Sequence, residues 1–407
     1  MALERIKELP YPFQLKRPVY VVCNDTMVEN PIITEYVDQV LSDIEKAARE
    51  KELPIFVEKT LPKIEETYWV NVLGKGYPVP NNSFRWCTDK MKIRPTSAFI
   101  EEQVNEKGEA IILIGTRSDE STTRSQSIKK HEIKGRRLAK HPNHINTMVY
   151  SPIKELMLEE VWYVINALES PWESDNTRLF QIYADASADD YECPTVVTDK
   201  SHSSCGQSRF GCWTCTVVKE DKSMSSLVKN GATWMQPLLD YRQSLVDERN
   251  LSENRMPVRR NGQIAVTEDG HNQGTYEPAY RAKKLRQLLE IQAQIQKINP
   301  IAQLITNQEL IAIQVYWYRD GIFDYKVNSI YSKIYGTEID TADSSFFNNI
   351  EKRLLTESCK ENTKDVDLIK QLLTLQRSKT LLLTKYGLQN DIENRIEQFV
   401  KEEANEN

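Results

Sequence analysis

Long apolar runs are missing from this chain of 407 residues. No segment is long enough to cross a bilayer, and the first ten residues lack the apolar core of a signal peptide. Internal repeats and low-complexity tracts are absent as well. We therefore expect a cytoplasmic protein with no membrane partner, built from about two or three domains.

An excess of positive charge is also missing, because 53 Lys and Arg residues face 59 Asp and Glu residues, giving a net charge of -6. This balance argues against a broadly basic nucleic-acid coat, although local basic patches can still bind phosphates.

The cysteines number seven, and three of them lie within residues 204–215. An odd, bunched set fits metal ligands kept reduced in a cytosol better than a secreted disulfide framework.

The bunched cysteines predict a metal or iron-sulfur site. Cys212 and Cys215 are separated by two residues, so a single turn can direct both at one metal. Cys205 reaches the same centre if the segment containing Gly206 and Gly211 curls back. Tetrahedral zinc and iron-sulfur clusters both use such spacing, and each needs a fourth ligand from elsewhere. The alternative is a loop that contains small buried cysteines.

The first part of the chain alternates predicted strands with helices, which indicates an α/β fold with a parallel sheet. An apolar run predicts a buried strand, and Asn30 followed by Pro31 marks the start of a helix that ends near Glu50. The predicted strands occupy residues 19–23, 55–58 and 111–114. Ligands gather at the carboxyl ends of parallel strands, so Asp25 and the loop of residues 115–121 are candidate binding positions.

That loop, with Gly115, Arg117 and Glu120, suits nucleotide binding, and a solvated charged loop is the alternative.

A cysteine that stands alone, such as Cys87, is usually a packing residue. Because the three bunched cysteines lack a fourth ligand, Cys87 is a candidate for that position.

A basic segment follows the loop and is barely offset by Glu132. We predict that it binds DNA phosphates, and a solvated surface loop is the alternative, because no aromatic residues interleave. The predicted DNA-binding residues are Arg124, Lys129, Lys130, Lys134, Arg136, Arg137 and Lys140.

Several of these motifs resemble a known family. Residues 84–92 with Cys87, the Gly115-Thr116-Arg117 loop, and residues 150–153 followed by Val161-Trp162 resemble the phosphoadenylylsulfate reductase branch of the ATP pyrophosphatases. Residues 24–26, 29–31, 84–88 and 205–218 are more closely similar to the DndC-type sulfurtransferases of bacterial DNA phosphorothioation. The resemblance covers roughly residues 1–290.

The resemblance implies an adenine nucleotide alpha hydrolase-like fold, in which a parallel sheet is flanked by helices. It also implies ATP with Mg²⁺ as nucleotide and a 4Fe-4S cluster as cofactor. Asp25, Thr26, Gly115 and Arg117 would contact the nucleotide, and Arg117 with Glu120 would have catalytic roles. Asp25 has an alternative role as a helix-entry residue.

The same resemblance assigns the cluster ligands. Cys87 would join Cys205, Cys212 and Cys215, and Cys193 is a rival for one of the four positions. Cys23 lies in a strand pattern and Cys359 in a helical one, so we expect both to be structural.

One departure from the family concerns its phosphate-binding loop. The family opens with a Ser-Gly-Gly-Lys-Asp-Ser motif between its first strand and first helix, and this motif is absent from the sequence. Residues 2–9 resemble the tail of the helix that follows the motif, so we expect the first strand and the phosphate loop to be missing. Backbone amides at such a loop would normally hold the pyrophosphate.

The composition suggests three regions, namely residues 1–165 as the nucleotide domain, residues 166–279 as a cysteine-rich cluster insertion with loops, and residues 280–407 as an all-α C-terminal domain. Residues 282–298 have helical periodicity, Thr306 with Glu309 indicates a capping box, and residues 366–400 can hold two further helices. We expect this last region to serve packing or partner docking.

The resulting expectation is an enzyme of a family that uses ATP to adenylate a DNA backbone phosphate, releasing pyrophosphate, before sulfur enters. Without the phosphate loop we expect residues 1–407 alone to release almost no pyrophosphate from ATP. Its partners would be DNA, a cysteine desulfurase as sulfur donor, and the other proteins of this DNA modification and restriction system. One alternative is a reductase of sulfonucleotides. The other is a non-catalytic metal-cluster scaffold that binds DNA.

Overall fold

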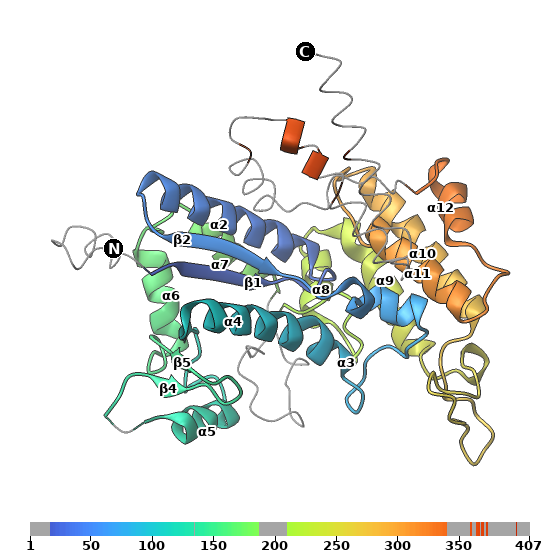
Figure 1. The fold of residues 1–407 in the computed structure, drawn as a ribbon, viewed down its shortest axis with the longest axis horizontal. Coiled ribbons are helices and arrows are strands. Elements are labelled where there is room, and N and C mark those ends of the chain that lie inside the picture. The colour runs from blue at the N-terminus through green and yellow to red at the C-terminus, as the bar shows by residue number, and fades with distance from the viewer. Residues whose placement is uncertain are drawn as a thin grey trace. The chain divides into compact units, whose positions relative to one another are not determined.

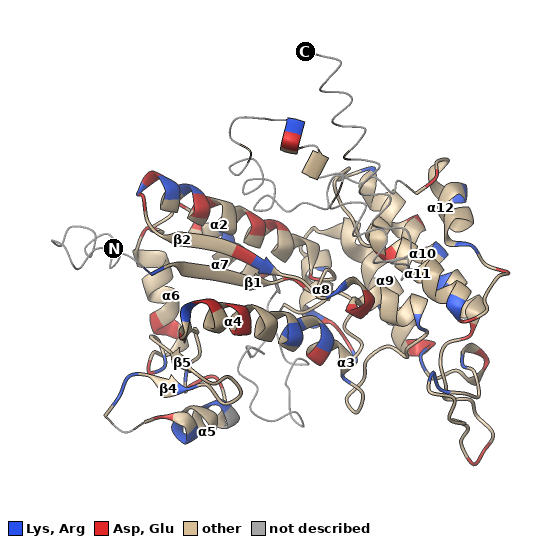
Figure 2. Ribbon diagram, in the orientation of Figure 1, with Lys and Arg blue, Asp and Glu red and all other residues tan. Residues whose placement is uncertain are grey.

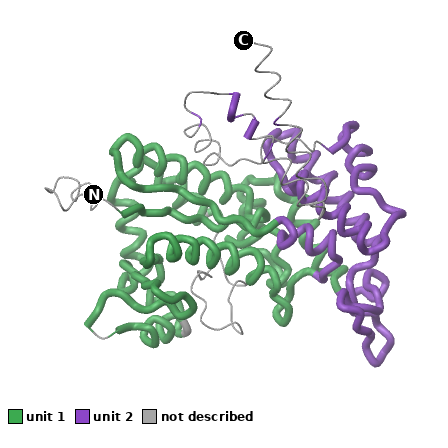
Figure 3. Tube along the Cα trace, in the orientation of Figure 1, with its two compact units in different colours: residues 1–63, 79–249 green, residues 64–78, 250–407 purple. Residues whose placement is uncertain are grey.

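The computed structural model describes residues 17–133, 135–186 and 210–339, together with residues 359, 364–366, 368–369, 372 and 396. These residues form a mixed α/β fold with short strands (Figure 1). Contacts divide the chain into two compact units, unit 1 with residues 1–63 and 79–249, and unit 2 with residues 64–78 and 250–407 (Figure 3). The short segment 64–78 therefore belongs with the C-terminal part of the chain.

The described strands of unit 1 form two small sheets. In the first sheet β1 pairs in parallel with β2, from Val19 opposite Ile55 to Asn24 opposite Thr60. In the second sheet β5 lies between β3, which is parallel to it, and β4, which is antiparallel. The bounds are β1 Val19–Asn24, β2 Ile55–Thr60, β3 Ala110–Leu113, β4 Ala139–Lys140 and β5 Thr147–Tyr150.

The prediction of a buried strand at residues 19–23 was right about the strand and wrong about its burial. Val19 and Val22 are 37% and 39% exposed, and no residue of β1 is fully buried. Among the described strands β1 pairs with β2 alone, so one of its edges has no neighbouring strand in that part of the chain. An edge strand shields its side chains less than a central strand does.

The first long helix begins where the sequence predicts. Asn30 caps α2 by accepting a hydrogen bond from the amide of Ile32, and Pro31 occupies the first helical position. Figure 1 shows α2 and α4 on either side of the β1–β2 pair, and both helices contact β2. The helices of unit 1 are α2 Pro31–Glu50, α3 Trp86–Thr88, α4 Arg94–Lys107, α5 Thr122–His131, α6 Leu158–Ala167, α7 Asn176–Ala186, α8 Lys222–Lys229 and α9 Gln236–Asp247, with short turns at Asp89–Ile93 and Thr233–Met235.

Unit 2 is mainly helical in its described part and contains a tryptophan-rich core. Trp69 and Trp317 are fully buried, and their indole nitrogens donate to the carbonyls of Leu304 and Leu73, each at 2.7 Å. A buried indole requires such an acceptor. The helices are α10 Pro278–Gln296, α11 Asn307–Arg319 and α12 Val327–Tyr335, with short turns at Ile64–Glu66, Val70–Gly74 and Ser252–Asn254.

The predicted capping box of the C-terminal region is confirmed. The Thr306 hydroxyl accepts from the amide of Glu309, and the Glu309 carboxylate accepts from the amide of Thr306, which begins α11. Most of the helices predicted at residues 366–400 lie outside the described residues. None of the described helices is long and apolar enough to cross a membrane.

Candidate functional site

The carboxyl end of β1 runs into a tight turn that Asp25 shapes. Asp25 Oδ1 accepts a hydrogen bond from the amide of Met27 at 2.7 Å, and Met27 has a left-handed φ of 63°. Lys59 Nζ lies 3.9 Å from the other carboxylate oxygen of Asp25. An aspartate that accepts from the backbone two residues ahead stabilises turns of this kind. Asp25 thus stabilises the turn that leads toward α2, and the cap of that helix is Asn30.

The cysteine motif folds back onto this turn. Cys212 pairs with Glu29 in an isolated antiparallel bridge, and the amide of Trp213 donates to the carbonyl of Val28 at 3.0 Å. The Cys212 sulfur lies 3.3 Å from Thr26 Oγ1 and 3.9 Å from the Glu29 carboxylate. The Thr26 hydroxyl donates to Glu29 at 2.8 Å, so a protonated Cys212 can donate to the Thr26 oxygen or to the Glu29 carboxylate. Two predicted site residues, Thr26 and Cys212, thus lie in contact.

A buried arginine fixes the rest of the cysteine motif. Arg242 of α9 is fully buried, and its guanidinium donates to backbone carbonyls of the segment that contains Cys215. The acceptors are Cys215 at 2.8 Å, Lys219 at 2.9 Å and Val218. Because a guanidinium has five N–H donors in a planar fork, one side chain can hold several carbonyls at once. The shape of this loop therefore depends on Arg242.

Two further contacts tie the motif to the chain segment before Cys87. The Thr216 hydroxyl donates to the carbonyl of Pro80 at 2.6 Å, and Arg249 donates to the same carbonyl at 3.3 Å. Trp213 is 2% exposed and packs against Tyr241. The described part of the motif is thus held by its neighbours at Trp213 and at Thr216.

The predicted metal ligands are only partly within the described residues. The amide of Cys215 donates to the carbonyl of Cys212 at 2.9 Å, so these two cysteines share one tight turn, as a pair of metal ligands requires. Cys87 lies on α3, next to Thr88, whose buried hydroxyl has no hydrogen-bond partner. Cys205 and the rival Cys193 lie outside the described residues. In the part of the chain that the structure describes, no three His, Cys, Asp or Glu side chains gather as metal ligands.

The two cysteines that we expected to be structural lie on other parts of the chain than this motif. Cys23 is on β1, and burial raises the pKa of its thiol, which disfavours the reactive thiolate. Cys359 is half-buried and lies in the C-terminal part of the chain.

The loop after β3 is a buried, hydrogen-bonded turn. Arg117 is 6% exposed, its amide donates to the Glu120 carboxylate at 3.1 Å, and its guanidinium donates to the carbonyl of Leu156 at 3.4 Å. The hydroxyl groups of Thr116 and Ser151 are 2.9 Å apart, which joins the ends of β3 and β5. The alternative of a solvated charged loop is wrong for Arg117, because its guanidinium is enclosed by protein.

Glu120 is the acidic centre of this turn. Its carboxylate lies 3.9 Å from Arg117 and 3.3 Å from Arg124. Burial raises the pKa of Glu120, and the two arginines oppose this shift only in part. Both predicted catalytic residues of this loop, Arg117 and Glu120, therefore hold each other in place.

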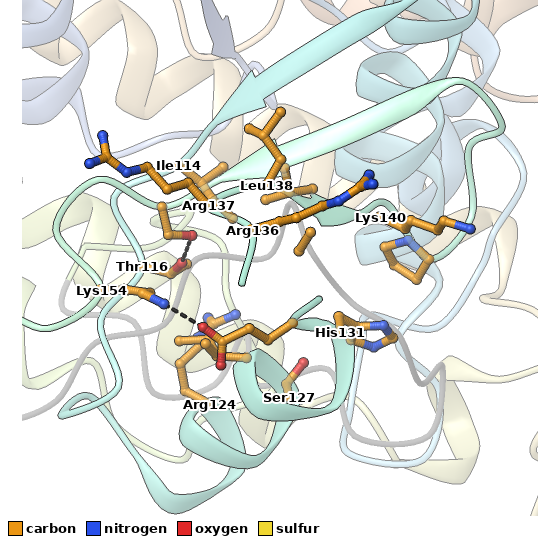
Figure 4. A pocket seen from close by; sticks show the side chains of 16 residues that line it. Ile114, Thr116, Arg124, Ser127, His131, Arg136, Arg137, Leu138, Lys140 and Lys154 are labelled. Atoms are coloured by element: carbon orange, nitrogen blue, oxygen red, sulfur yellow. Dashed lines mark hydrogen bonds and ion pairs between the residues drawn. The ribbon is translucent and has the colours of Figure 1, made fainter. Parts of the chain in front are cut away.

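The predicted DNA-binding segment divides into two groups. Figure 2 shows basic residues along α5 and along the segment that follows it. Arg124, Arg136, Arg137 and Lys140 line a pocket between α5 and the β4–β5 strands (Figure 4). Lys129 and Lys130 are exposed on α5 and are not among the residues that line the pocket. Lys134 lies outside the described residues.

Sequence reasoning missed several residues of this pocket. Lys154 lines it and forms an ion pair with Glu132 at 2.6 Å. Ser127 and His131 come from α5, and Ser151 follows β5. One signal was available, because the chain after β5 meets the chain after its parallel neighbour β3, and ligand sites collect at such ends. The rule that points to residues 115–121 after β3 points equally to Ser151 and Lys154 after β5.

A scan against protein-family models gave no match to this chain. Searches of curated proteins and of solved structures also gave no match. The family resemblance therefore rests on the motifs themselves.

Proposed function

We propose that this chain is a cytoplasmic sulfurtransferase of DNA phosphorothioate modification, with the fold of the adenine nucleotide alpha hydrolases. Its partners would be DNA, a cysteine desulfurase and the other proteins of the modification system. The motifs at residues 84–88 and 205–218 are the sequence basis of the proposal.

The observation that carries the proposal is the pairing of Glu29 with Cys212. It joins the cysteine motif to the carboxyl end of β1, beside Thr26, which the resemblance assigns to the nucleotide. An enzyme that activates a phosphate with ATP and then adds sulfur needs both functions in one place, because positioning the reactants accounts for much of the rate. A nucleotide site and a cysteine motif in contact fit that requirement.

In the proposed reaction a DNA phosphate oxygen attacks the α-phosphorus of ATP, and pyrophosphate leaves. This step makes AMP the leaving group, so that the terminal sulfur of a desulfurase persulfide can form a bond to the DNA phosphorus as AMP departs. A second thiol would then cleave the remaining S–S bond, which leaves the phosphorothioate on DNA and forms a disulfide with the persulfide's inner sulfur. Thr26 and Asp25 would orient the nucleoside, and Arg117 beside Gly115 would face negative charge on the nucleotide. Glu120 would keep Arg117 oriented, as their contacts support.

The bound groups would have limited and separate roles. Mg²⁺ would neutralise charge on the ATP phosphates. A four-iron cluster on Cys87, Cys205, Cys212 and Cys215 would tie distant segments together, and the shared turn of Cys212 and Cys215 suits two of these ligands.

The test is sulfur incorporation into DNA. In cells that supply the other modification proteins, and with a Ser-Gly-Gly-Lys-Asp-Ser phosphate loop added on the N-terminal side of the chain, we expect DNA digests analysed by mass spectrometry to contain phosphorothioate dinucleotides. Cys212→Ser should abolish them, and Cys359→Ser should leave them unchanged. Absence of phosphorothioate, combined with sulfite release from phosphoadenylylsulfate in vitro, would instead favour the reductase alternative.

A further inference from the structure

The pocket between α5 and the β4–β5 strands has an unusual charge. Its lining includes five cationic side chains and one carboxylate, Glu132, and that carboxylate is paired with Lys154 at 2.6 Å. The cationic residues are Arg124, Arg136, Arg137, Lys140 and Lys154. In Figure 4 the side chains of Arg136 and Lys140 extend to the right and that of Arg137 to the left, and Lys154, Arg124 and Ser127 lie below them. Two of these cations are thus paired within the protein, since Arg124 also lies 3.3 Å from the Glu120 carboxylate, and Arg136, Arg137 and Lys140 supply the remaining positive charge.

The neutral polar residues of the lining complete a set of hydrogen-bond donors. His131 lines the pocket, and its Nε2 is buried without a hydrogen-bond partner. Ser127 contributes a hydroxyl from the same helix, and the Thr116 and Ser151 hydroxyls form a pair 2.9 Å apart. A buried imidazole nitrogen without a partner is unfavourable by about 1–3 kcal/mol, and a bound acceptor would offset this penalty.

From these observations we infer that the pocket binds a phosphate group at the carboxyl ends of β3 and β5, attracted by the cations of its lining and placed beside the Nε2 of His131, which has no hydrogen-bond partner. Tetrahedral oxyanions suit such a lining, because they accept several charge-assisted hydrogen bonds at once. The phosphate can belong to a DNA backbone or to a small phosphorylated molecule. The inference rests on the pocket alone and does not depend on the proposed sulfur chemistry.

A pocket and a diffuse basic surface make different predictions for neighbouring cations. Lys129 and Lys130 are exposed on α5 and do not line the pocket, whereas Arg136 and Arg137 are exposed and do line it. Removing either pair changes the net charge equally. Non-specific attraction to phosphates depends mainly on the number of neutralised charges, so a diffuse surface would respond to both changes alike.

The experiment compares Arg136→Gln/Arg137→Gln with the matched control Lys129→Gln/Lys130→Gln at one fixed salt concentration. Inorganic phosphate is titrated calorimetrically, and a labelled DNA duplex is titrated by fluorescence anisotropy. We expect phosphate affinity to fall by roughly tenfold or more in the arginine variant, because charge-assisted hydrogen bonds are lost. The phosphate affinity of the lysine variant should stay within about twofold of the wild-type value.

The DNA titration identifies the source of the phosphate. Weaker DNA binding by the arginine variant alone supports a backbone phosphate, and loss of phosphate binding with DNA binding unchanged supports a small phosphorylated ligand. Equal weakening of inorganic phosphate binding in both variants, or no phosphate binding by the wild type, overturns the inference. His131→Asn provides a second test if the arginine variant does not fold. It should also weaken phosphate binding, and unchanged affinity would contradict the assigned site.

Discussion

Single buried side chains decide the shape of the candidate site. Arg242 is the clearest case, because its fully buried guanidinium holds the carbonyls of the loop that contains Cys215. Those carbonyls would lose their donors together if the guanidinium were removed.

We predict that Arg242→Met destabilises the protein by about 3 kcal/mol, because several buried carbonyls lose charge-assisted hydrogen bonds. Chemical denaturation of both proteins measures the change. The control is Lys229→Met, which removes an exposed cation from α8 and should have little effect. A loss below about 1 kcal/mol for Arg242→Met would mean that the loop keeps its shape by other contacts.

Another buried side chain that affects stability is the imidazole of His141. Burial, together with the neighbouring His144 and His131, lowers the pKa of His141 to about 4. Its Nδ1 accepts from the amides of Asn143 and His144, so the neutral ring carries its proton on Nε2. The folded protein therefore holds this histidine neutral.

This pKa makes stability depend on pH in a known direction. Between pH 6.5, the ordinary pKa of histidine, and pH 4, the His141 imidazole is protonated in the unfolded chain and neutral in the folded protein. Stability should therefore fall as pH falls through this window, by on the order of 2 kcal/mol for this group. Urea unfolding at successive pH values should show that His141→Asn, whose amide oxygen can still accept the backbone amides, lacks this component. His271→Asn, at an exposed position, should keep it.

At the scale of elements, local signals set where the helices begin. Asn30 is 4% exposed and caps α2 directly after the loop that contacts Cys212. Its side chain satisfies the amide of Ile32 at 3.0 Å, one of the donors left open at a helix start.

Asn30→Ala should lower stability by about 1 kcal/mol, because the first turn of α2 loses its cap. Asn30→Ser, which keeps a capping oxygen, should restore most of the loss. Thermal melts of the three proteins measure the difference. Equal melting temperatures for Ala and Ser would show that the cap contributes nothing at this helix.

At the scale of the whole molecule, the proposed cluster would join segments far apart in sequence. Cys212 already lies beside Glu29, 183 residues away, through protein contacts. A cluster on Cys87 and Cys205 as well would add covalent links between metal and protein to these contacts.

Protein purified without oxygen should therefore contain about four irons per chain, as a cysteine-ligated cubane requires. Cys212→Ser or Cys215→Ser should lose the iron and lower the melting temperature, because ligand loss uncouples the linked segments. Cys359→Ser should change neither property. Iron analysis with absorbance spectra makes the measurement, and zinc without iron in the wild type would contradict the prediction.

The sequence by itself determined the features that depend on neighbours in the chain. The Asn30-Pro31 helix start, the Thr306–Glu309 capping box and the strand at residues 19–23 were all predicted, because caps and periodicity act over a few residues. The same local pattern misjudged the burial of Val19 and Val22, since burial depends on which strands lie alongside.

Only the tertiary structure decided which distant residues meet. The pairing of Cys212 with Glu29 and the anchoring of Cys215 by Arg242 have no signature in either segment alone. The basic segment shows the same limit, because its composition does not distinguish Arg136, which lines the pocket, from Lys129, which does not. Such choices depend on the direction of each side chain from its element, and packing between elements fixes that direction.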